Sequence, residues 1–337
     1  MHLKRLAWVA LLLAPATAVA GEGKVSGEAY ADLYWVAENH DSALVDQNGA
    51  WFRRIYLTYD YKFDEEFSTR IRLEAASPGD FKSSDVMTTF IKDAYLKWQK
   101  SNQSILVGVQ PTPTFGIIED VWYYRSLERT AADLQRLASS RDLGLGFKGG
   151  VGPEQKIGYH VLFGNGSSTK AETDTKKKIM AALSYNFTKQ LLVEVYGDYE
   201  DRVNDADRRT YQGYVAYRGD RFRAGALYMV QNRNTVGEDV ELRILSVGAA
   251  GAVSDRVWLV GRVDRNFDPN PEGAKITFIP FDPTAANTFV IAAVDFRVRE
   301  TVSVMPNVEI VVYDEPEAGG PTPDTDVIPR LTFFFRF

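Results

Sequence analysis

Long segments of this chain alternate between apolar and polar residues, and this alternation limits the folds open to it. Successive side chains of a β-strand point to opposite faces of a sheet, so a period of two predicts strands. The segment 53–62 divides into two faces, one with Arg53, Ile55, Leu57, Tyr59 and Tyr61, the other with Arg54, Tyr56, Thr58, Asp60 and Lys62. About sixteen such segments follow one another, and many are longer than the 5–6 residues or so of a globular strand.

The connections between these segments alternate between short and long. The short ones are 64–66, 100–102, 188–190, 219–220 and 254–255, and the long ones include 37–49, 166–175, 268–286 and 314–323. Tight turns at one end and long loops at the other describe a closed antiparallel meander. A soluble β-sandwich has shorter strands and no such asymmetry. The sequence therefore predicts an all-β fold, a transmembrane antiparallel up-and-down β-barrel of about 16 strands.

The first residues predict export. Lys4 and Arg5 precede a short apolar run from Leu6 to Ala14, and small residues at 18–20 form a cleavage site. This order is typical of a secretory signal peptide, and the apolar run is too short to span a bilayer as a helix. We therefore assign residues 1–20 to a signal peptide and residues 21–337 to one barrel domain.

Composition excludes several classes of protein. The whole chain carries a net charge of −6, and without Lys4 and Arg5 the remainder carries −8, which argues against nucleic acid as a partner. Cysteine is absent, which excludes disulfide and thiolate chemistry. We expect no cofactor and no metal.

The C-terminal segment fits a strand that faces lipid on one side. Val327, Leu331 and Phe333 share one face with the terminal Phe337, whereas Arg330 lies on the opposite face. We expect Phe337 in the aromatic girdle of the barrel. A strand that ends in an aromatic residue also resembles the C-terminal signal that the assembly machinery of the bacterial outer membrane reads.

Two prolines fit the pattern less well. Pro306 and Pro329 lie inside predicted strands. A closed barrel has no free edge, so each proline must remove a ladder hydrogen bond or lie at a bulge. We expect bulges or shifted strand starts at both positions.

One connection, residues 111–140, is much longer than the others. It is the third long loop, and unstructured loops beyond about 12–15 residues are usually functional. Thr130 is placed to cap a short helix that contains Asp133. The loop also carries several aromatic residues, which need a surface to pack on. If it folds into the barrel, its charged residues line a constriction: Glu119, Asp120, Arg125, Glu128, Arg129 and Asp133.

Together these features resemble a bacterial porin. The signal peptide, about sixteen strands, a longest third loop and a terminal phenylalanine all match, and Pro113–Gly116 resembles the Pro-x-Phe-Gly at which the third loop of general porins turns inward. The phosphate-selective porin family is similar too, although the sequence shows no lysine ladder. The resemblance implies a homotrimer in the outer membrane of a Gram-negative bacterium, with a water-filled channel for small hydrophilic solutes and ions.

Charged residues on the polar faces are candidates for the pore wall, because lumen-facing residues tune selectivity. Arginines fall on these faces at both ends of the chain: Arg54, Arg70, Arg72, Arg262, Arg297, Arg330 and Arg336. Because the first and last strands of a barrel are neighbours, we expect these arginines to form one positively charged surface opposite the acidic loop residues. We therefore expect a slight preference for anions. In the alternative interpretation these arginines pair with Asp60, Glu74, Asp264 and Asp295 on the wall.

Three rival hypotheses receive little support. An outer-membrane β-barrel enzyme needs a nucleophile next to a base, and neither His40 nor His160 lies in such a motif. The glycines of 144–149 have dinucleotide-motif spacing, but a turn and a strand follow them instead of a helix. An adhesive barrel without a channel is the third, and sixteen strands enclose too wide a space for side chains alone to fill. We expect a channel and not an enzyme.

Overall fold

The computed structural model describes residues 21–234 and 239–337. The predicted signal peptide, residues 1–20, lies outside the described residues. Among the described residues, no helix has the length and apolarity needed to cross a membrane.

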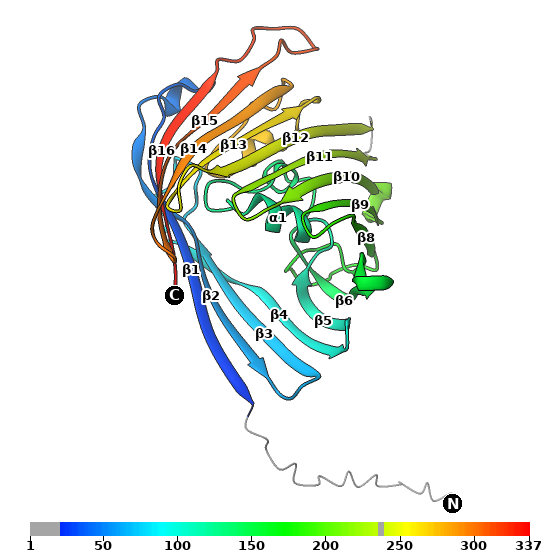
Figure 1. Cartoon of the computed structure of the whole chain (residues 1–337). Helices are drawn as coiled ribbons and strands as arrows, with labels where there is room; N and C mark the ends of the chain where they lie inside the picture. The colour runs from blue at the N-terminus through cyan, green and yellow to red at the C-terminus, as the bar shows by residue number, and fades with distance from the viewer. Residues whose placement is uncertain (1–20, 235–238) are drawn as a thin grey trace, which may run out of the picture.

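Sixteen antiparallel strands form a closed barrel in which every strand pairs with its sequence neighbours (Figure 1). The first and last strands close the ring through seven residue pairs, from Glu28 opposite Arg336 to Tyr34 opposite Arg330. The strands are β1 Glu22–Trp35, β2 Asn48–Lys62, β3 Phe67–Ala76, β4 Thr88–Lys100, β5 Gln103–Pro111, β6 Arg141–Val151, β7 Ile157–Gly164, β8 Lys178–Asn186, β9 Leu191–Glu200, β10 Arg208–Arg218, β11 Phe222–Arg233, β12 Val240–Ala252, β13 Val257–Asn266, β14 Asn287–Arg299, β15 Val302–Tyr313 and β16 Asp326–Arg336. The predicted fold class is confirmed.

The outward side chains of the wall are apolar. Because side chains alternate along each strand, one side chain in two faces out, and large apolar residues are exposed there around the ring. They include Leu57, Ile71, Val107, Phe163, Leu183, Val195, Val215, Val247, Leu259 and Val312. A band of this kind suits the hydrocarbon core of a membrane and gives water no polar partner.

Aromatic pairs cluster where the strands meet the short turns. The ring centroids of Tyr61 and Phe63 lie 5.0 Å apart, and those of Tyr185 and Phe187 lie 4.9 Å apart. Phe337 stacks on Phe335 at the same end and exchanges two backbone hydrogen bonds with Gly27. A Cβ atom on Gly27 would lie 2.3 Å from the ring of Phe337, so the glycine makes room for the terminal residue. This end of the barrel has the aromatic girdle typical of membrane interfaces.

Two β-bulges turn pairs of adjacent charges inward. In β2 the register shifts so that Tyr30 pairs with Arg54 and Ala31 with Phe52, which leaves Arg53 as the extra residue. In β4 a similar shift leaves Lys92 extra beside Asp93. A regular strand would point one residue of each charged pair at lipid, which is costly near the bilayer centre.

Bulges do not occur at the two prolines, contrary to the sequence-based expectation. The register of β15 against β16 runs unbroken through Pro306 and Pro329. Instead, the ladder of β14 with β15 skips Met305 and Pro306 without a shift in register. Pro329 lies directly beyond the last paired residue of β16 with β1, Arg330. Each proline therefore coincides with a gap in one ladder, where a missing N–H costs little.

Two connections contain most of the buried structure inside the ring. Residues 112–140, here called the lumenal segment, contain α1 Gly116–Trp122 and α2 Ala131–Leu134, and α1 is seen within the barrel in Figure 1. Residues 267–286, the second lumenal segment, contain the short 3₁₀ helix η4 Gly273–Lys275. Three further 3₁₀ turns lie in other connections: η1 Ser42–Leu44, η2 Pro153–Gln155 and η3 Val203–Asp205. The helix predicted after Thr130 exists as α2, but the Thr130 side chain makes no capping hydrogen bond.

Candidate functional site in the barrel lumen

The lumenal segment is attached to strands on several sides of the ring. On one side Gln212 of β10 donates to the Thr114 carbonyl at 3.2 Å, and Arg262 of β13 donates to the Arg129 carbonyl at 2.6 Å. On another side Arg53 of β2 donates to the Ser126 carbonyl. A segment bound to β2, β10 and β13 at once lies inside the ring, which agrees with Figure 1.

One face of the lumenal segment is packed into a dry core. Trp122, Leu127 and Leu134 are buried against inward side chains of β12–β16, among them Phe289 and Ile291. The second lumenal segment completes this core with Ile276, Ile279, Phe281 and Ala285. Residues at the start of the lumenal segment, including Phe115 and Ile118, form a second core with β9–β12. We call β11–β16 with its packed segments the dry half of the barrel.

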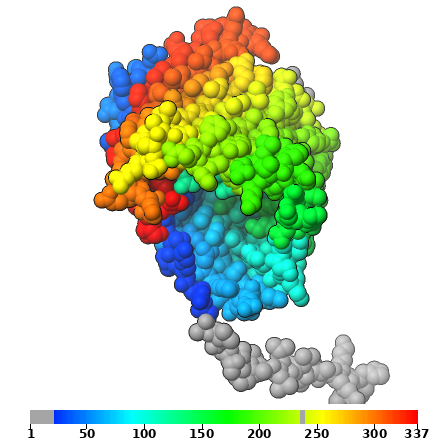
Figure 2. Space-filling model, viewed as in Figure 1, coloured from blue at the N-terminus to red at the C-terminus, as the bar shows by residue number. Residues whose placement is uncertain are grey.

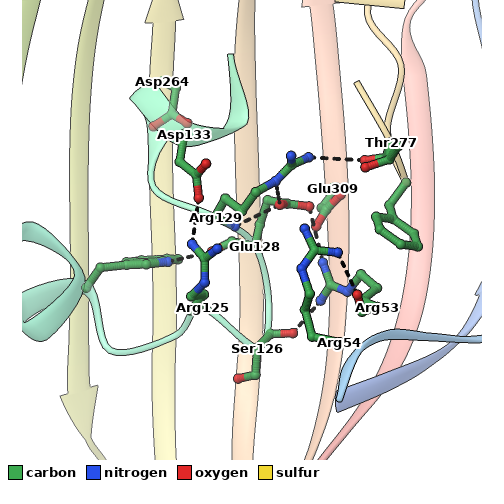
Figure 3. A network of polar contacts seen from close by, with 12 residues as sticks. Arg53, Arg54, Arg125, Ser126, Glu128, Arg129, Asp133, Asp264, Thr277 and Glu309 are labelled. Carbon is green, nitrogen blue, oxygen red and sulfur yellow. Dashed lines mark hydrogen bonds and ion pairs between the residues drawn. The ribbon is translucent and has the colours of Figure 1, made fainter. Parts of the chain in front are cut away.

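Glu128 anchors the other face of the lumenal segment. Its carboxylate pairs with Arg53 and with Arg129, each at 3.2 Å (Figure 3). It also lies 3.9 Å from Arg330. Burial by itself raises the pKa of this carboxyl, but the guanidinium groups of Arg129, Arg53 and Arg330 outweigh burial and hold the pKa well below its usual range. Glu128 is therefore ionised at neutral pH and fixes the segment between the first and last strands.

Arg125 forms a second ion-pair group next to open space. Its guanidinium lies 2.8 Å from the Glu119 carboxylate and 2.6 Å from that of Asp133. Burial raises the pKa of Asp133, but Arg125 and Arg129 outweigh it and lower the pKa to about 2. Figure 3 shows Arg125 and Asp133 pointing toward each other from two parts of the segment.

The strands opposite the lumenal segment carry an excess of positive charge. The Glu74 carboxylate is shared by Arg54 at 2.6 Å and Lys92 at 2.9 Å. The Asp93 carboxylate is likewise shared, by Arg72 at 3.6 Å and by Arg141. We call the cations that face the lumen from β2–β6 the basic wall: Arg54, Arg70, Arg72, Lys92, Lys97, Arg141 and Lys148.

The basic wall carries more cations than carboxylates. Only three carboxylates lie within 4.0 Å of these seven cations in the described part of the chain: Glu74, Asp93 and Asp60, the last paired with Arg70 at 2.7 Å. Seven positive charges against three negative ones leave an excess of four on this side of the lumen.

Open space lies on both sides of the Arg125–Asp133 pair. A cavity of about 840 Å³ at the short-turn end is lined by Glu119, Arg125 and Arg297, among others. A cavity of about 680 Å³ at the long-loop end is lined by Lys92, Arg129, Asp133 and Arg141. The space-filling view shows the barrel to be hollowed between the blue-to-cyan wall and the yellow-to-green wall (Figure 2). The ion pair thus stands between two hollows of the lumen.

The structure brings some of the predicted pore residues together and separates others. Arg125 contacts Glu119 and Asp133, and Asp133 lines the same cavity as Arg129. Arg54 and Arg72 pair with carboxylates of their own wall. Arg70 lies on the same wall toward the short turns. Asp120 pairs with Arg218 at the short-turn end and lines the 840 Å³ cavity together with Glu119 and Arg125.

Two of the predicted arginines do not reach the open lumen. The Arg262 side chain is 3 % exposed, lies under Trp122 and pairs with Asp264 at 2.9 Å. The Arg330 side chain is 0 % exposed and pairs with Glu309 at 2.7 Å. They were expected in the pore wall because alternation points them inward, but packing of the lumenal segments covers them.

The alternative pairing of wall arginines with wall carboxylates is confirmed for four pairs. Arg54 pairs with Glu74, Arg70 with Asp60, Arg262 with Asp264, and Arg297 with Asp295 at 3.1 Å. Arg297 also stacks on Trp258 beside the larger cavity, and Arg336 donates to the Tyr123 hydroxyl at 3.4 Å.

Arg53 and Lys92 are lumenal residues that the alternation pattern missed. The pattern places Arg53 on the apolar face, yet its guanidinium lies 2.7 Å from Asp32 inside the barrel. The missed signal is the presence of adjacent charges, Arg53–Arg54 and Lys92–Asp93, within strands that cross a membrane. One member of each pair must face lipid unless a bulge intervenes.

The described residues offer no site for a metal ion and no nucleophile–base pair at the histidines. Groups of three or more potential ligands do not occur in 21–234 or 239–337. His40 lies 2.9 Å from Asp326 and 3.2 Å from the Tyr313 hydroxyl, where it ties a loop to the strand ends. The glycines of 144–149 lie within β6, so the dinucleotide-like spacing belongs to a strand.

Comparison with known proteins connects this architecture to one fold. No family model and no curated protein matches the sequence. Among solved structures, the barrel is similar to the anion-selective porin from Comamonas acidovorans, with a TM-score of 0.69, 10 % identity, and coverage of 94 % of this chain and 100 % of that one. It is also similar to the outer membrane channel DcaP of Acinetobacter baumannii, with a TM-score of 0.67, 14 % identity, and coverage of 94 % and 97 %.

A third similar structure is OmpF of Salmonella typhi, with a TM-score of 0.66, 12 % identity, and coverage of 94 % of this chain and 97 % of that one. Identities this low bear on the fold, and all three barrels match over nearly their whole length. With its closed ring of sixteen strands and its apolar outer band, the chain has the fold of the bacterial outer-membrane porins.

Proposed function

We propose that this barrel is a channel for passive diffusion of small hydrophilic solutes and ions across the outer membrane. The observation that carries the proposal is the pair of large, charge-lined cavities on opposite sides of the Arg125–Asp133 ion pair. The closed ladder satisfies the backbone hydrogen bonds of the wall, so the barrel does not need a packed interior to be stable. Charged side chains next to open space attract water into the lumen.

The path runs past the lumenal segment, beside Lys92 and Arg141 of the basic wall at the long-loop end and beside Arg297 and Arg336 of β14 and β16 at the short-turn end. At the long-loop end of the segment, Asp133 and Lys92 line the same cavity from opposite sides. Such opposed charges produce a transverse field that orients dipolar solutes and disfavours apolar ones.

A slight preference for anions follows from the excess charge of the basic wall. The uncompensated cations of the basic wall raise the electrostatic potential in the lumen and concentrate anions there. The proposal includes a constriction of the channel formed by residues 111–140 and lined by the charged side chains named above.

Conductance in planar bilayers tests the function, and reversal potentials in asymmetric KCl test the preference. We expect stepwise ohmic currents and a permeability ratio that favours chloride. A purified, folded barrel that gives no current overturns the channel proposal, whereas a cation-selective current overturns only the preference.

A channel specific for phosphate-like anions is the alternative, and the excess of wall cations is the observation that favours it. If the channel is specific, phosphate at millimolar concentration blocks the chloride current, and the block saturates as the phosphate concentration rises. A general diffusion pore shows no saturable block under the same conditions.

Two further features belong to the proposal. The porin-like fold implies a homotrimer, which cross-linking in native membranes tests. We also propose that Phe337 is read by the outer-membrane assembly machinery after residues 1–20 are removed as a signal peptide. Deletion of Phe337 then lowers the amount of folded barrel in the membrane.

A further inference from the structure

A third cavity, of about 410 Å³, lies at the short-turn end between β4–β9 and the start of the lumenal segment. Charged side chains enter it from two sides. Lys97 of β4 and Lys148 of β6 lie on one side, and Glu194 of β9 lies on the other. Pro113 and Ile117 of the lumenal segment supply an apolar surface between them. The cavity is separate from the Arg125–Asp133 constriction.

Glu194 is a buried carboxylate without a partner. Its residue is 4 % exposed, and Oε1 is enclosed with no hydrogen-bond donor among the described residues. Burial without a partner favours the neutral form of a carboxyl group, and a cation brought into the cavity would stabilise the ionised form of Glu194. The other lumenal carboxylates described above, such as Glu128 and Asp133, each contact at least one guanidinium.

The two lysines, in turn, have no carboxylate partner among the described residues. In the described part of the chain, no carboxylate lies within 4.0 Å of the ammonium of Lys97 or Lys148. Lys148 is paired across the ladder with His160, whose Nε2 is also buried without a partner. This side of the cavity therefore offers two cations and an unsatisfied imidazole to an anionic group.

The ladder sets how far apart the two sides lie. Glu194 of β9 lies opposite Ser184 of β8 in the ladder, and Ser184 lies opposite Gly158 of β7. Lys148 of β6 lies opposite His160, which is two residues from Gly158 along β7. Lys148 and Glu194 are three strands apart, or about 14 Å at the usual strand spacing. Their long side chains shorten this distance by several ångströms within the cavity. A dipeptide spans at most about 7 Å between its ends, which fits the remaining gap.

Gly158 keeps the middle of the cavity open. A Cβ atom at this position would lie 2.5 Å from the Ser184 hydroxyl oxygen. The glycine thus leaves the hydroxyl accessible as a neutral hydrogen-bonding group between the two charged sides.

We propose that this cavity is a binding site for a short zwitterionic peptide, with its carboxylate at Lys97 and Lys148 and its ammonium at Glu194. The site deepens the proposed channel function and rests on it, since a solute reaches the cavity through the lumen. It gives the channel a preferred solute class beyond simple ions.

Glycylglycine tests the site as a blocker of ion current at about 0.1 M salt, where charges are only partly screened. N-acetylglycylglycine, which keeps the carboxylate alone, and glycylglycinamide, which keeps the ammonium alone, are the matched probes. We expect glycylglycine to block at the lowest concentration. The E194Q variant raises its half-blocking concentration about tenfold and leaves that of the acetylated probe unchanged.

A matched control removes a different lumenal carboxylate. Glu28 lines the 840 Å³ cavity, so E28Q changes the net charge equally without touching the proposed site. The double variant K97Q K148Q weakens block by glycylglycine and by the acetylated probe. Equal block in the wild type, E194Q and E28Q overturns the proposal, as does equal block by glycylglycinamide and glycylglycine.

Calorimetry with glycylglycine and the detergent-solubilised barrel separates this site from the channel function. Binding that E194Q weakens about tenfold supports the site even when no current is recorded. A conducting barrel that binds no glycylglycine overturns the site and leaves the channel intact.

Discussion

The two halves of this barrel have the same backbone and opposite interiors. From β2 to β6 the inward side chains are mainly charged and face cavities. From β11 to β16 many are apolar, including Phe289, Ile291 and Val311, and two lumenal segments cover them. Closure of the ladder satisfies the backbone in both halves, so the inward side chains alone decide whether water or protein fills the space.

Burial explains why the dry half holds the segments in place. Phe281 of the second lumenal segment packs on Phe289 of β14 with ring centroids 5.8 Å apart, and both side chains are fully buried. Each such side chain stabilises the packed state by about 1.5–3 kcal/mol relative to exposure. The basic wall provides no comparable apolar surface, so the path stays open beside it.

Removing the lumenal segment should have the largest effect, because it uncovers the interior of the dry half and widens the lumen. Deletion of Ile118–Ala138 leaves Thr112 and Ser140 as neighbours, since they already share a backbone hydrogen bond of 3.2 Å. We expect single-channel conductance to rise at least about twofold, because the lumen of a sixteen-stranded barrel is too wide for its wall to fill. An unchanged conductance in a variant that still resists proteolysis contradicts the constriction.

Truncation of an aromatic residue in each half sharpens the comparison of stability. Phe281→Ala leaves a cavity in a dry core and should destabilise the protein by about 3–5 kcal/mol. Tyr95→Ala in the open half, where Tyr95 lines a cavity of about 570 Å³ that water can enter, should cost about 1 kcal/mol. Urea unfolding in lipid vesicles, followed by tryptophan fluorescence, measures both, and equal costs refute the division into halves.

Charge removal compares the halves in function. Lys92→Gln lowers the potential along the proposed path and should reduce the anion-to-cation permeability ratio about two- to threefold. Arg262→Gln removes the same charge from under Trp122 in the dry half and should leave the ratio unchanged while lowering stability. Reversal potentials in asymmetric KCl distinguish them, and a similar shift for both variants contradicts the assignment of the path.

The sequence predicts the strands of the barrel wall better than it predicts which segments pack inside the barrel. Alternation and the spacing of turns are local properties, so the strands and their order follow from the chain alone. Alternation also explains why the alternative of wall arginines paired with wall carboxylates is open to sequence reasoning, since Arg54 and Glu74 lie on inward faces of neighbouring strands.

What the sequence does not predict depends on long-range packing. Both faces of β14 read as apolar, with Phe289 and Ile291 inward and Val290 and Phe296 outward. Nothing local distinguishes a face that meets lipid from one that meets a folded loop. The covered positions of Arg262 and Arg330 follow from this, because alternation places a side chain inside without saying what fills the inside.

Acidification should loosen the lumenal segment and produces the smallest expected effect. Glu128 and Asp133 have pKa values lowered by their guanidinium partners, so their ion pairs stabilise the fold above the ordinary carboxyl pKa, near 4, and this stabilisation is lost as the pH falls toward about 2. We expect a constant conductance from pH 8 to about 4.5, and flickering between conductance levels below about pH 3.

The double variant E128Q D133N removes both titrating groups and should flicker already at pH 7. If it instead keeps a steady current and the same acid transition as the wild type, other groups hold the segment. In that case the apolar packing of the dry half, rather than the ion pairs beside the path, sets the width of the channel.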